Sequence, residues 1–309
     1  MLTSAAIKEK LLALGYSGAG VIPAVDFDDY IPPLEKRVES FPQSAEFYKG
    51  LYGMAKVPKE AKSIIVATRK YSQYKVPDSL KGRIGKVYMF DGRLEHSAER
   101  KAYNKFREYL SDGGVNIIRA PIPARRAAVR AGLGFWGDNN FLYTPDGSYV
   151  WIDNWAVDIE LEYENPDMDA ISAKKLCNEN CRKCVEACPT GALCGKYSMD
   201  MGKCVTRITS DESGGTLSDE VNKNMGQWLY GCDACQDACP MNYGKLTGTE
   251  NFPGLSEIEK LLSLESILEM DADTYRETLQ PWFFYISEDG QWLWKRHALR
   301  AMKNGGASA

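Results

Sequence analysis

The sequence has little histidine, no long apolar run and no excess of basic residues. Its 309 residues include two histidines, His96 and His297, and 38 Lys and Arg side chains against 42 Asp and Glu, a net charge of −4. Two widely separated histidines make histidine-rich zinc, copper and non-haem iron sites difficult to build. The acidic balance, without a basic run, argues against a broad nucleic-acid surface. No stretch approaches the roughly 18 uninterrupted apolar residues of a membrane span.

The N-terminus also lacks a secretory signal. The segment 1–18 interleaves charged and apolar side chains, as a short amphipathic helix does, and has no apolar core followed by a cleavage site. We therefore expect a cytoplasmic protein. Because thiols stay reduced in the cytosol and an odd number of cysteines cannot pair completely within one chain, the nine cysteines are expected to bind metal.

The cysteines are confined to one segment, between Cys177 and Cys239, and this divides the chain. We predict an α/β domain over residues 1–165, a cysteine-rich module over 166–250, and C-terminal helices with a tail over 251–309. Amphipathic periodicity predicts helices in the first and last of these parts, and the tail from Asn304 is expected to be disordered. The predicted helices cover residues 4–14, 93–111, 255–280 and 292–302.

Short apolar runs predict the strands of the first domain. Two further runs flank Pro145-Asp146-Gly147, a turn sequence, and predict a hairpin. The predicted strands are 20–22, 63–67, 86–90, 116–118, 141–144 and 148–152.

One motif occurs twice in the cysteine segment. The run from Cys181 to Pro189 reads CxxCxxxCP, and the same pattern recurs 51 residues later from Cys232 to Pro240. In two-cluster ferredoxins, the cysteine before proline ligates the other iron–sulfur cluster. We therefore predict two 4Fe–4S clusters with crossed ligands. The first set is Cys177, Cys181, Cys184 and Cys239, and the second is Cys188, Cys204, Cys232 and Cys235.

Two other metal sites share parts of this spacing. All-cysteine zinc sites would use the two CxxC pairs but leave the repeated Cys-Pro unexplained. The spacing from Cys177 to Cys184 matches the radical-SAM signature, but that site keeps one iron open, whereas a fourth thiol is available here. Cys194 is left over, and we expect it to be a small buried apolar residue.

Several short motifs lie along most of the chain. They are Ala120-Pro121, Arg125, Ala131 to Phe135 with Gly137, Gly147-Ser148, Cys188-Pro189-Thr190, Tyr230 to Asp233, and Cys235-Gln236. These motifs resemble those of the epoxyqueuosine reductases and, more distantly, the reductive dehalogenases, and the segment 293–304 resembles the family's helix that follows the clusters. The resemblance implies a nitroreductase-like α/β domain that holds base-off cobalamin beside a ferredoxin-like double-cluster module, with electrons passing from reduced ferredoxin or flavodoxin through both clusters to the cobalt.

The resemblance also indicates which residues hold the cofactor, and the scarcity of histidine fits a cobalt without a histidine ligand. Arg125 matches the family and is the favoured polar contact. The glycines of the 132–137 turn are interpreted as positions where a bulky macrocycle approaches the backbone closely. The residues expected to bind the cofactor are Arg125, Gly132, Gly134, Gly137, Leu142, Tyr230, Gly231 and Asp233.

The sequence departs from the family at the proton donor. The acidic residue of the family's Asp-(Ser/Thr)-Ala-Pro segment is replaced by Ile118, the usual lysine after the glycine-rich turn is Asp138, and the C-terminal helical repeats are missing. We therefore expect a small-molecule substrate rather than epoxyqueuosine in tRNA. Weak candidates for a replacement donor are Tyr143, Tyr149, Asp138 and Arg119, each of which also has a structural interpretation.

Two other functions remain open at this point. Without a substrate proton donor, the chain could act as an electron-transfer protein that reduces or activates the corrinoid of a partner. Alternatively, the nitroreductase-like domain could hold a flavin instead of cobalamin, which we consider the weaker alternative.

Overall fold

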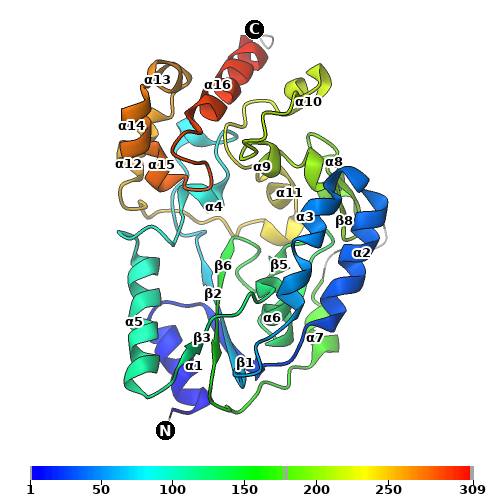
Figure 1. The fold of residues 1–309 in the computed structure, drawn as a ribbon, viewed down its shortest axis with the longest axis vertical. Coiled ribbons are helices and arrows are strands. Elements are labelled where there is room, and N and C mark those ends of the chain that lie inside the picture. Colours follow the sequence, from blue (N-terminus) through cyan, green and yellow to red (C-terminus); the bar gives the residue numbers. More distant parts are fainter. Residues whose placement is uncertain (1, 176, 178–179, 307–309) are drawn as a thin grey trace.

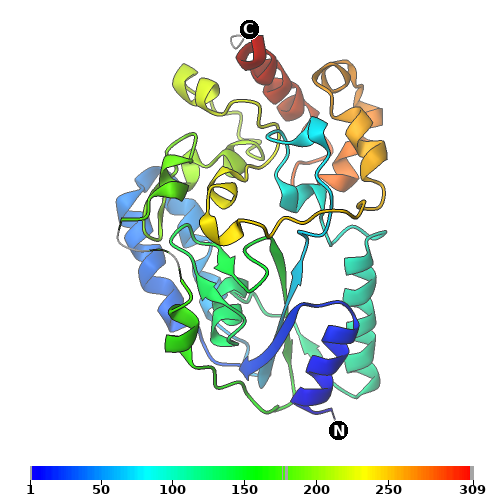
Figure 2. The same ribbon diagram turned by 180° about the vertical axis from the view of Figure 1, so that it is seen from behind.

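A four-stranded antiparallel sheet forms the centre of the first half of the chain. This computed structural model describes residues 2–175, 177 and 180–306. The strands β1 (Gly18–Pro23), β2 (Ser63–Lys70), β6 (Val150–Val157) and β3 (Ile117–Ile118) lie in the order β1-β2-β6-β3. Each neighbouring pair is antiparallel. Figures 1 and 2 show this sheet in the lower half of the molecule, with helices on both faces.

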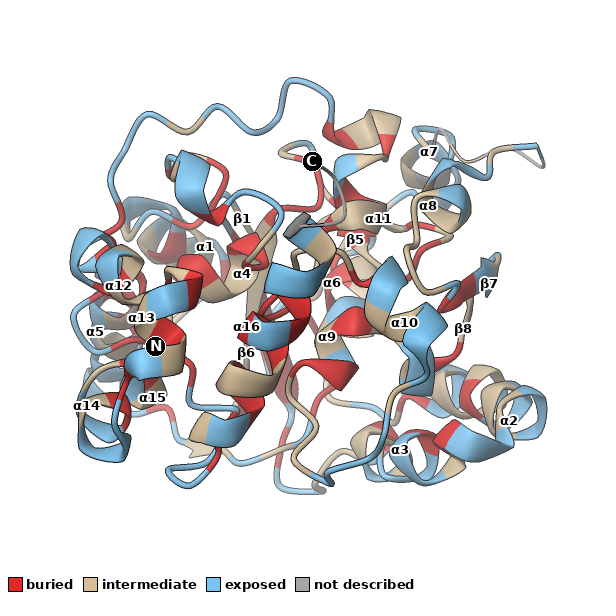
Figure 3. Cartoon of the chain, turned by 90° about the horizontal axis from the view of Figure 1, so that it is seen from above, coloured by how far each residue is buried: buried red, intermediate tan, exposed pale blue. Residues whose placement is uncertain are grey.

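The central strand β2 is buried on both faces, which explains its continuous apolar sequence. Ile65 and Ala67 pack with helices α1 (Ser4–Ala13) and α5 (Ala98–Asp112), whereas Ile64 and Val66 pack on the other face with α6 (Ala124–Arg130). Helices α2 (Ile31–Ser40) and α3 (Ala45–Lys49) lie beyond that face and present exposed surfaces (Figure 3).

The second half of the chain consists of short helices and one small hairpin. Figure 1 places the cysteine segment beside α2 and α3, and the C-terminal helices around α4 (Lys86–Met89). The cysteine segment contains α7 (Met168–Ser172), α8 (Lys183–Glu186), β7 (Leu193–Gly195), β8 (Ser198–Met199), α9 (Val205–Ile208), α10 (Asp219–Asn224) and α11 (Ala234–Asp237). The C-terminal part contains α12 (Leu255–Leu261), α13 (Leu264–Glu269), α14 (Ala272–Glu277), α15 (Leu279–Trp282) and α16 (Gln291–Gly306).

Two secondary-structure predictions were wrong. Residues 86–90 form the short helix α4 rather than a strand, and Lys86 is held there by distant acidic residues described below. The turn before Gly147 is present, but its flanking strands do not pair as a hairpin: β5 (Leu142–Tyr143) pairs with β4 (Phe135–Trp136), and β6 joins the main sheet. Because short apolar runs carry no information about their partners, these pairings were not visible in the sequence.

Two helix boundaries also differ. The helix predicted over 93–111 begins at Ala98, because the Ser97 hydroxyl caps it by accepting a hydrogen bond from the Arg100 amide at 3.0 Å. At the other end of the chain, α16 continues through Asn304 to Gly306, where disorder was predicted. The rest of that predicted tail, 307–309, lies outside the described residues. None of the described helices is long and apolar enough to cross a membrane.

Candidate metal and cofactor site

The two cysteine repeats form two matching structures that pack against each other. In each copy a short helix, α8 or α11, begins beside the second cysteine of the CxxC pair, and the third cysteine follows its end. Each repeat therefore presents the two thiols of its CxxC pair beside the start of the helix and the third thiol beyond the helix end.

The first thiol set gathers around Cys184. Burial first, and then the neighbouring thiols of Cys177, Cys239 and Cys181, raise the pKa of Cys184 to about 11. Cys239 belongs to the second repeat in sequence but lies with the thiols of the first. Cys177, Cys181 and Cys184 also line a pocket of about 330 Å³, together with Arg182 and Lys196.

The second thiol set gathers around Cys232 and Cys235. Burial is the main reason why the pKa of Cys232 is raised, to about 12, and Cys204 and Cys188 also raise it. The same two thiols contribute to the raised pKa of Cys235. Cys188 belongs to the first repeat, so each repeat contributes its Cys-Pro thiol to the group formed by the other.

Thiol geometry and chemistry fit iron–sulfur cubes better than single ions. Within the described residues, no three His, Cys, Asp or Glu side chains converge as a single-ion site. A 4Fe–4S cube is larger than one ion, so its four thiolates stand farther apart, and four thiolates are the ligands that it takes. Each set supplies four.

Cys194 lies apart from both sets. We expected a buried side chain, and this was wrong: Cys194 is exposed on β7, with its Sγ 3.7 Å from the Gly191 carbonyl oxygen. Side chains alternate along a strand, so the inward position is taken by its neighbour Leu193, which is buried.

The glycines of the 132–137 turn are explained by packing within the chain. Gly132 has a φ of +73°, and a Cβ there would lie 2.7 Å from Pro166. A Cβ at Gly134 would lie 2.2 Å from the Tyr143 carbonyl oxygen, and one at Gly137 would lie 2.4 Å from the Tyr143 ring. The side-chain space at these positions is filled by protein, so their interpretation as close-approach points for a macrocycle gains no support.

Tyr143 connects the glycine-rich loop to the first thiol set. Its hydroxyl accepts a hydrogen bond from Asn139 Nδ2 at 2.9 Å and donates one to the Cys239 thiol. Asn139 also donates to the carbonyl oxygen of Cys235, at 3.3 Å, so Asn139 connects Tyr143 to the second set. Burial is the main reason why the pKa of Tyr143 is raised.

Tyr149 and Asp233 belong to a buried charge network centred on Lys86. The Lys86 Nζ lies 2.7 Å from Asp237 and 3.2 Å from Asp233, and the Lys86 amide also donates to Asp233. Tyr149 donates its hydroxyl hydrogen to Asp237 at 2.5 Å. Burial alone would lower the pKa of Lys86, but the two carboxylates more than reverse that effect. Asp233 was predicted to contact the cofactor; its carboxylate is instead occupied by Lys86.

Asp138 is also occupied. It forms an ion pair with Lys175 at 2.5 Å, and Lys175 additionally donates to the Tyr197 hydroxyl at 2.8 Å. This pair lies at the pocket of the first thiol set, where Asp138 is one of the lining residues. The fourth donor candidate, Arg119, is exposed and has no hydrogen-bond or ion-pair partner among the described residues.

The remaining predicted cofactor contacts are packing residues. Leu142 is buried in the core between α6 and the sheet. Tyr230 stacks on Trp294, with ring centroids 5.4 Å apart, and its hydroxyl has no partner among the described residues. Gly231 has a φ of +70°, and a Cβ there would lie 2.6 Å from the Tyr88 ring, so glycine lets that ring pack closely.

Arg125 is exposed to solvent, yet burial by the surrounding protein is the largest influence on its pKa, which is lowered. It stacks 5.4 Å from the Phe141 ring and pairs with no carboxylate among the described residues. The groups that act on its charge are those of Tyr30, Arg37, Tyr88 and Tyr71.

Tyr88 connects the surroundings of Arg125 to the second thiol set. The charges of Arg93 and Cys204 both act on Tyr88, and Tyr88 in turn acts on Arg125. The Arg37 guanidinium lies over the Tyr48 ring, 5.6 Å from its centroid; burial first, and then Cys204 among other groups, raises the pKa of Tyr48 to about 12. Sequence reasoning missed these tyrosines, Arg37 and Lys86, because none stands in a motif. A buried lysine with two distant acidic partners leaves no local signal.

Residues 177–242 match the family described as the 4Fe-4S double cluster binding domain. An epoxyqueuosine reductase from Cyclobacterium marinum is 27% identical over 267 residues, which cover 82% of this chain and 84% of the relative. The chain is similar in sequence to the epoxyqueuosine reductases. The relative from Bacillus subtilis is 39% identical over 122 residues, which cover 39% of this chain and 29% of that protein.

Solved structures agree with this similarity. An epoxyqueuosine reductase crystallised with an epoxyqueuosine-modified tRNA-Tyr stem loop has a TM-score of 0.73 at 25% identity, covering 96% of this chain and 80% of that one. The present chain therefore has a mixed α/β fold similar to that of the reductase, with a 4Fe-4S double-cluster domain. A reductive dehalogenase structure reaches a TM-score of only 0.47 at 16% identity, so that similarity is weak. The resemblance predicted from the sequence motifs is confirmed for the reductases.

Proposed function

We propose that this chain is an iron–sulfur- and cobalamin-dependent reductase that carries electrons from the first thiol set through the second to a base-off corrinoid. The observation that supports it most strongly is the exchange of Cys188 and Cys239 between the two repeats, within a segment matched to double-cluster proteins. Crossed ligands bring two clusters close together, which is what electron transfer in two steps requires. Two separate zinc sites would gain nothing from the exchange.

The proposed ligands are those of the two thiol sets. Cys177, Cys181, Cys184 and Cys239 would hold the first cluster, and Cys188, Cys204, Cys232 and Cys235 the second. The first set lines a pocket that opens to solvent, whereas the charge of Cys204 in the second set acts on Tyr48 and Tyr88, and Tyr88 in turn acts on Arg125. We therefore place the electron-accepting end at the first cluster and the electron-delivering end at the second.

We propose that a large polar cofactor binds beside Arg125. The Arg125 guanidinium has no ion-pair partner among the described residues and would donate to amide or phosphate oxygens, and Tyr30 and Tyr88 lie near enough to act on its charge. Neither histidine is positioned to bind a metal there: His96 lies 3.1 Å from the Pro253 carbonyl oxygen, and His297 is buried on α16. A bound corrinoid would supply reducing chemistry at its cobalt. In this proposal the domain over residues 1–165 shapes the cofactor site, as the nitroreductase-like resemblance implies.

We propose a substrate other than epoxyqueuosine in tRNA, because Ile118 replaces the family's acid. Chain length does not distinguish the two substrates. The Cyclobacterium relative is matched over similar shares of both chains, so a protein of similar length is named an epoxyqueuosine reductase. The side chains of Asp138, Tyr143 and Tyr149 are occupied by partners elsewhere. Tyr30 and Tyr88 lie near enough to Arg125 to act on its charge. We therefore propose that one of their hydroxyl groups, rather than Asp138, Tyr143 or Tyr149, delivers the proton.

Anaerobic purification tests this function. We expect about eight irons and eight sulfides per chain, a corrinoid spectrum after extraction or after uptake of added cobalamin, and no consumption of epoxyqueuosine-tRNA. Clusters without corrinoid uptake would refute the cobalamin assignment, and flavin absorbance after denaturation would replace it. Reduction of a partner's corrinoid, without consumption of any organic substrate, would favour the electron-transfer alternative.

A further inference from the structure

We propose that the face around the pocket of the first thiol set is the docking site for an acidic, low-potential electron-carrier protein. This inference rests on the proposed function, since it requires a cluster at Cys177, Cys181 and Cys184. The pocket is lined by these thiols and also by Arg182 and Lys196. A cluster held there would lie behind a positively charged opening.

Basic residues dominate this face although the chain as a whole has a net charge of −4. Glu186 is the one exposed acid among the described residues between 173 and 196, and the exposed basic residues here form no ion pair within the described chain. Lys175, deeper in the pocket, is neutralised by Asp138. The exposed basic residues are Lys174, Arg182, Lys183 and Lys196. An uncompensated basic rim on an acidic protein attracts an acidic partner locally.

An exposed apolar patch adjoins the rim. Tyr243 is 60% exposed and Leu246 is 39% exposed, in the loop that follows the second repeat. The Lys183 Nζ lies 5.7 Å from the Tyr243 ring centroid, which ties the patch to the basic rim. Interfaces combine an apolar, often aromatic, centre with a charged border, and short-lived electron-transfer complexes use small ones.

The position of the rim favours a protein carrier over RNA, which is also polyanionic. Arg182 and Lys196 line the same pocket as three thiols, and an electron carrier that docks there shortens the distance that electrons cross. RNA carries no electrons, so it would gain nothing from docking beside the thiols.

The test compares two reductants on the anaerobic, cluster-loaded protein. We would replace Arg182, Lys183 and Lys196 by Glu and follow cluster bleaching by reduced flavodoxin and by dithionite in a stopped-flow instrument. The second-order rate with flavodoxin should fall at least about tenfold at low ionic strength, and the difference should shrink as salt is added. The rate with dithionite, a small anion that needs no docking, should fall by much less than the rate with flavodoxin.

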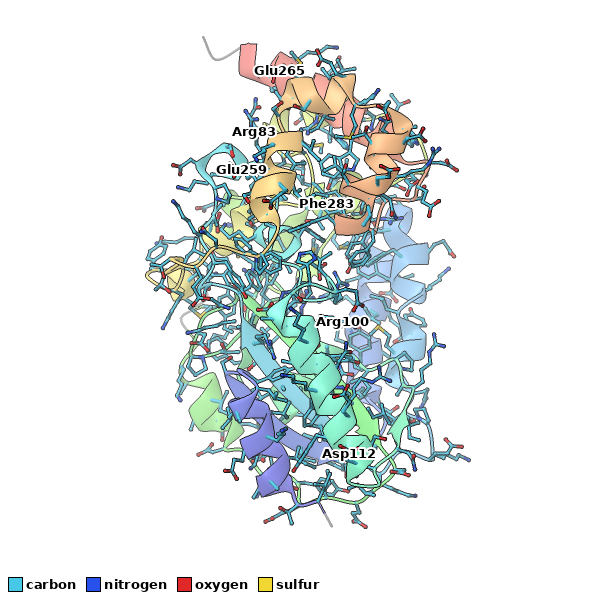
Figure 4. All side chains as sticks on the ribbon, turned by 90° about the vertical axis from the view of Figure 1, so that its left-hand side faces the viewer. Arg83, Arg100, Asp112, Glu259, Glu265 and Phe283 are labelled. Carbon is cyan, nitrogen blue, oxygen red and sulfur yellow. The ribbon has the colours of Figure 1, made fainter. Side chains whose placement is uncertain are left out.

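Two further variants keep the result interpretable. The first combines Lys174→Glu with Lys196→Glu, two positions outside the CxxC loop. It should lower the rate of reduction by flavodoxin by a smaller factor and leave the iron content unchanged. The matched control, Lys101→Glu, Lys105→Glu and Arg107→Glu, places three equal changes on α5, far from the thiols; Figure 4 shows this helix with Arg100 and Asp112 labelled. It should leave the flavodoxin rate within twofold.

Three results would overturn the docking site: unchanged flavodoxin reduction in both rim variants, an equal decrease in the α5 control, or lost RNA binding with normal reduction. Absence of clusters from the unaltered protein would instead refute the proposed function, so the two failures are distinguishable.

Discussion

The two thiol sets are alike in sequence but differ in their surroundings. The first lines a pocket at the surface, with Arg182 and Lys196 at its edge. In the second set, burial strongly raises the pKa of Cys235, and Cys232 packs against the small core of Val205, Ile208 and Met225. The two repeats therefore present the same kind of thiols in different surroundings.

The C-terminal helix contributes to this difference. Arg300 of α16 donates to the carbonyl oxygens of Gly226, at 3.2 Å, and Trp228, which precede the second CxxC pair. Tyr230, immediately before that pair, stacks on Trp294 of the same helix. The chain thus uses a long helix to cover one end of the cluster module, and leaves the other end uncovered.

The largest effect should follow from Cys239→Ala, which tests the crossed assignment. Cys239 follows the second repeat but lies with the first thiol set. The variant should lose about half of the iron, since one cluster of two loses a ligand. Combined with Cys181→Ala it should lose no more iron than either single variant, because both changes remove the same cluster.

The matched combination is Cys239→Ala with Cys235→Ala, which should lose nearly all iron because it removes one ligand from each cluster. Iron and sulfide analysis with EPR of the reduced protein measures both. If the Cys239–Cys181 pair proves additive and the Cys239–Cys235 pair does not, the ligands are not crossed.

A smaller effect, on stability, should follow from Lys86→Met. This change leaves the Asp233 carboxylate buried without its ion-pair partner, which costs about 3–5 kcal/mol. The denaturant midpoint of the anaerobic holoprotein measures the effect. Lys101→Met, on the exposed face of α5, should change stability by less than about 0.5 kcal/mol. Adding Asp233→Asn to Lys86→Met should recover part of the loss, and failure to do so would show that the buried charge is not its cause.

The same lysine predicts a pH dependence. Because its carboxylate partners raise the pKa of folded Lys86 above the ordinary value, its contribution to stability is complete below about pH 10 and is lost as the pH rises through the raised value. Lys86→Met should therefore flatten the alkaline decline in stability. An identical decline in both proteins would contradict this.

A smaller change still, in one reduction potential, should follow from Tyr143→Phe. The Tyr143 hydroxyl donates to the Cys239 thiol, and hydrogen bonds to cluster sulfur raise the potential. Without it the first cluster should become more negative by roughly 40 mV, since one hydrogen bond contributes about 1 kcal/mol and a tenfold one-electron change is about 59 mV. Tyr149→Phe, whose hydroxyl contacts Asp237, should shift neither potential. Redox titration followed by EPR distinguishes the clusters, and a shift of the second one alone would contradict the assignment.

Local patterns predicted much of the fold and long-range pairs predicted little. The strand 63–67, the helix ending before Gly113 and the cysteine repeats are each specified within a few residues, and the structure contains them. Residues 86–90 were mispredicted because their conformation depends on Asp233, 147 positions away. The residues around Arg125 could not be predicted either, because Tyr30, Arg37 and Tyr88 come from separate elements without a shared motif.

The smallest effect is expected for Cys194→Ser, which tests whether eight thiols suffice. The side chain is exposed on β7, and its recorded contacts are the carbonyl oxygens of Gly191 and Ala192, at 3.7 Å and 3.6 Å. Iron and sulfide content should be unchanged and stability should shift by less than about 0.5 kcal/mol. Because cluster ligands are not free to react, a maleimide should label one thiol of the anaerobic holoprotein and none in Cys194→Ser. Loss of iron in this variant would mean that Cys194 replaces one of the eight assigned ligands, and continued labelling would mean that another thiol is free.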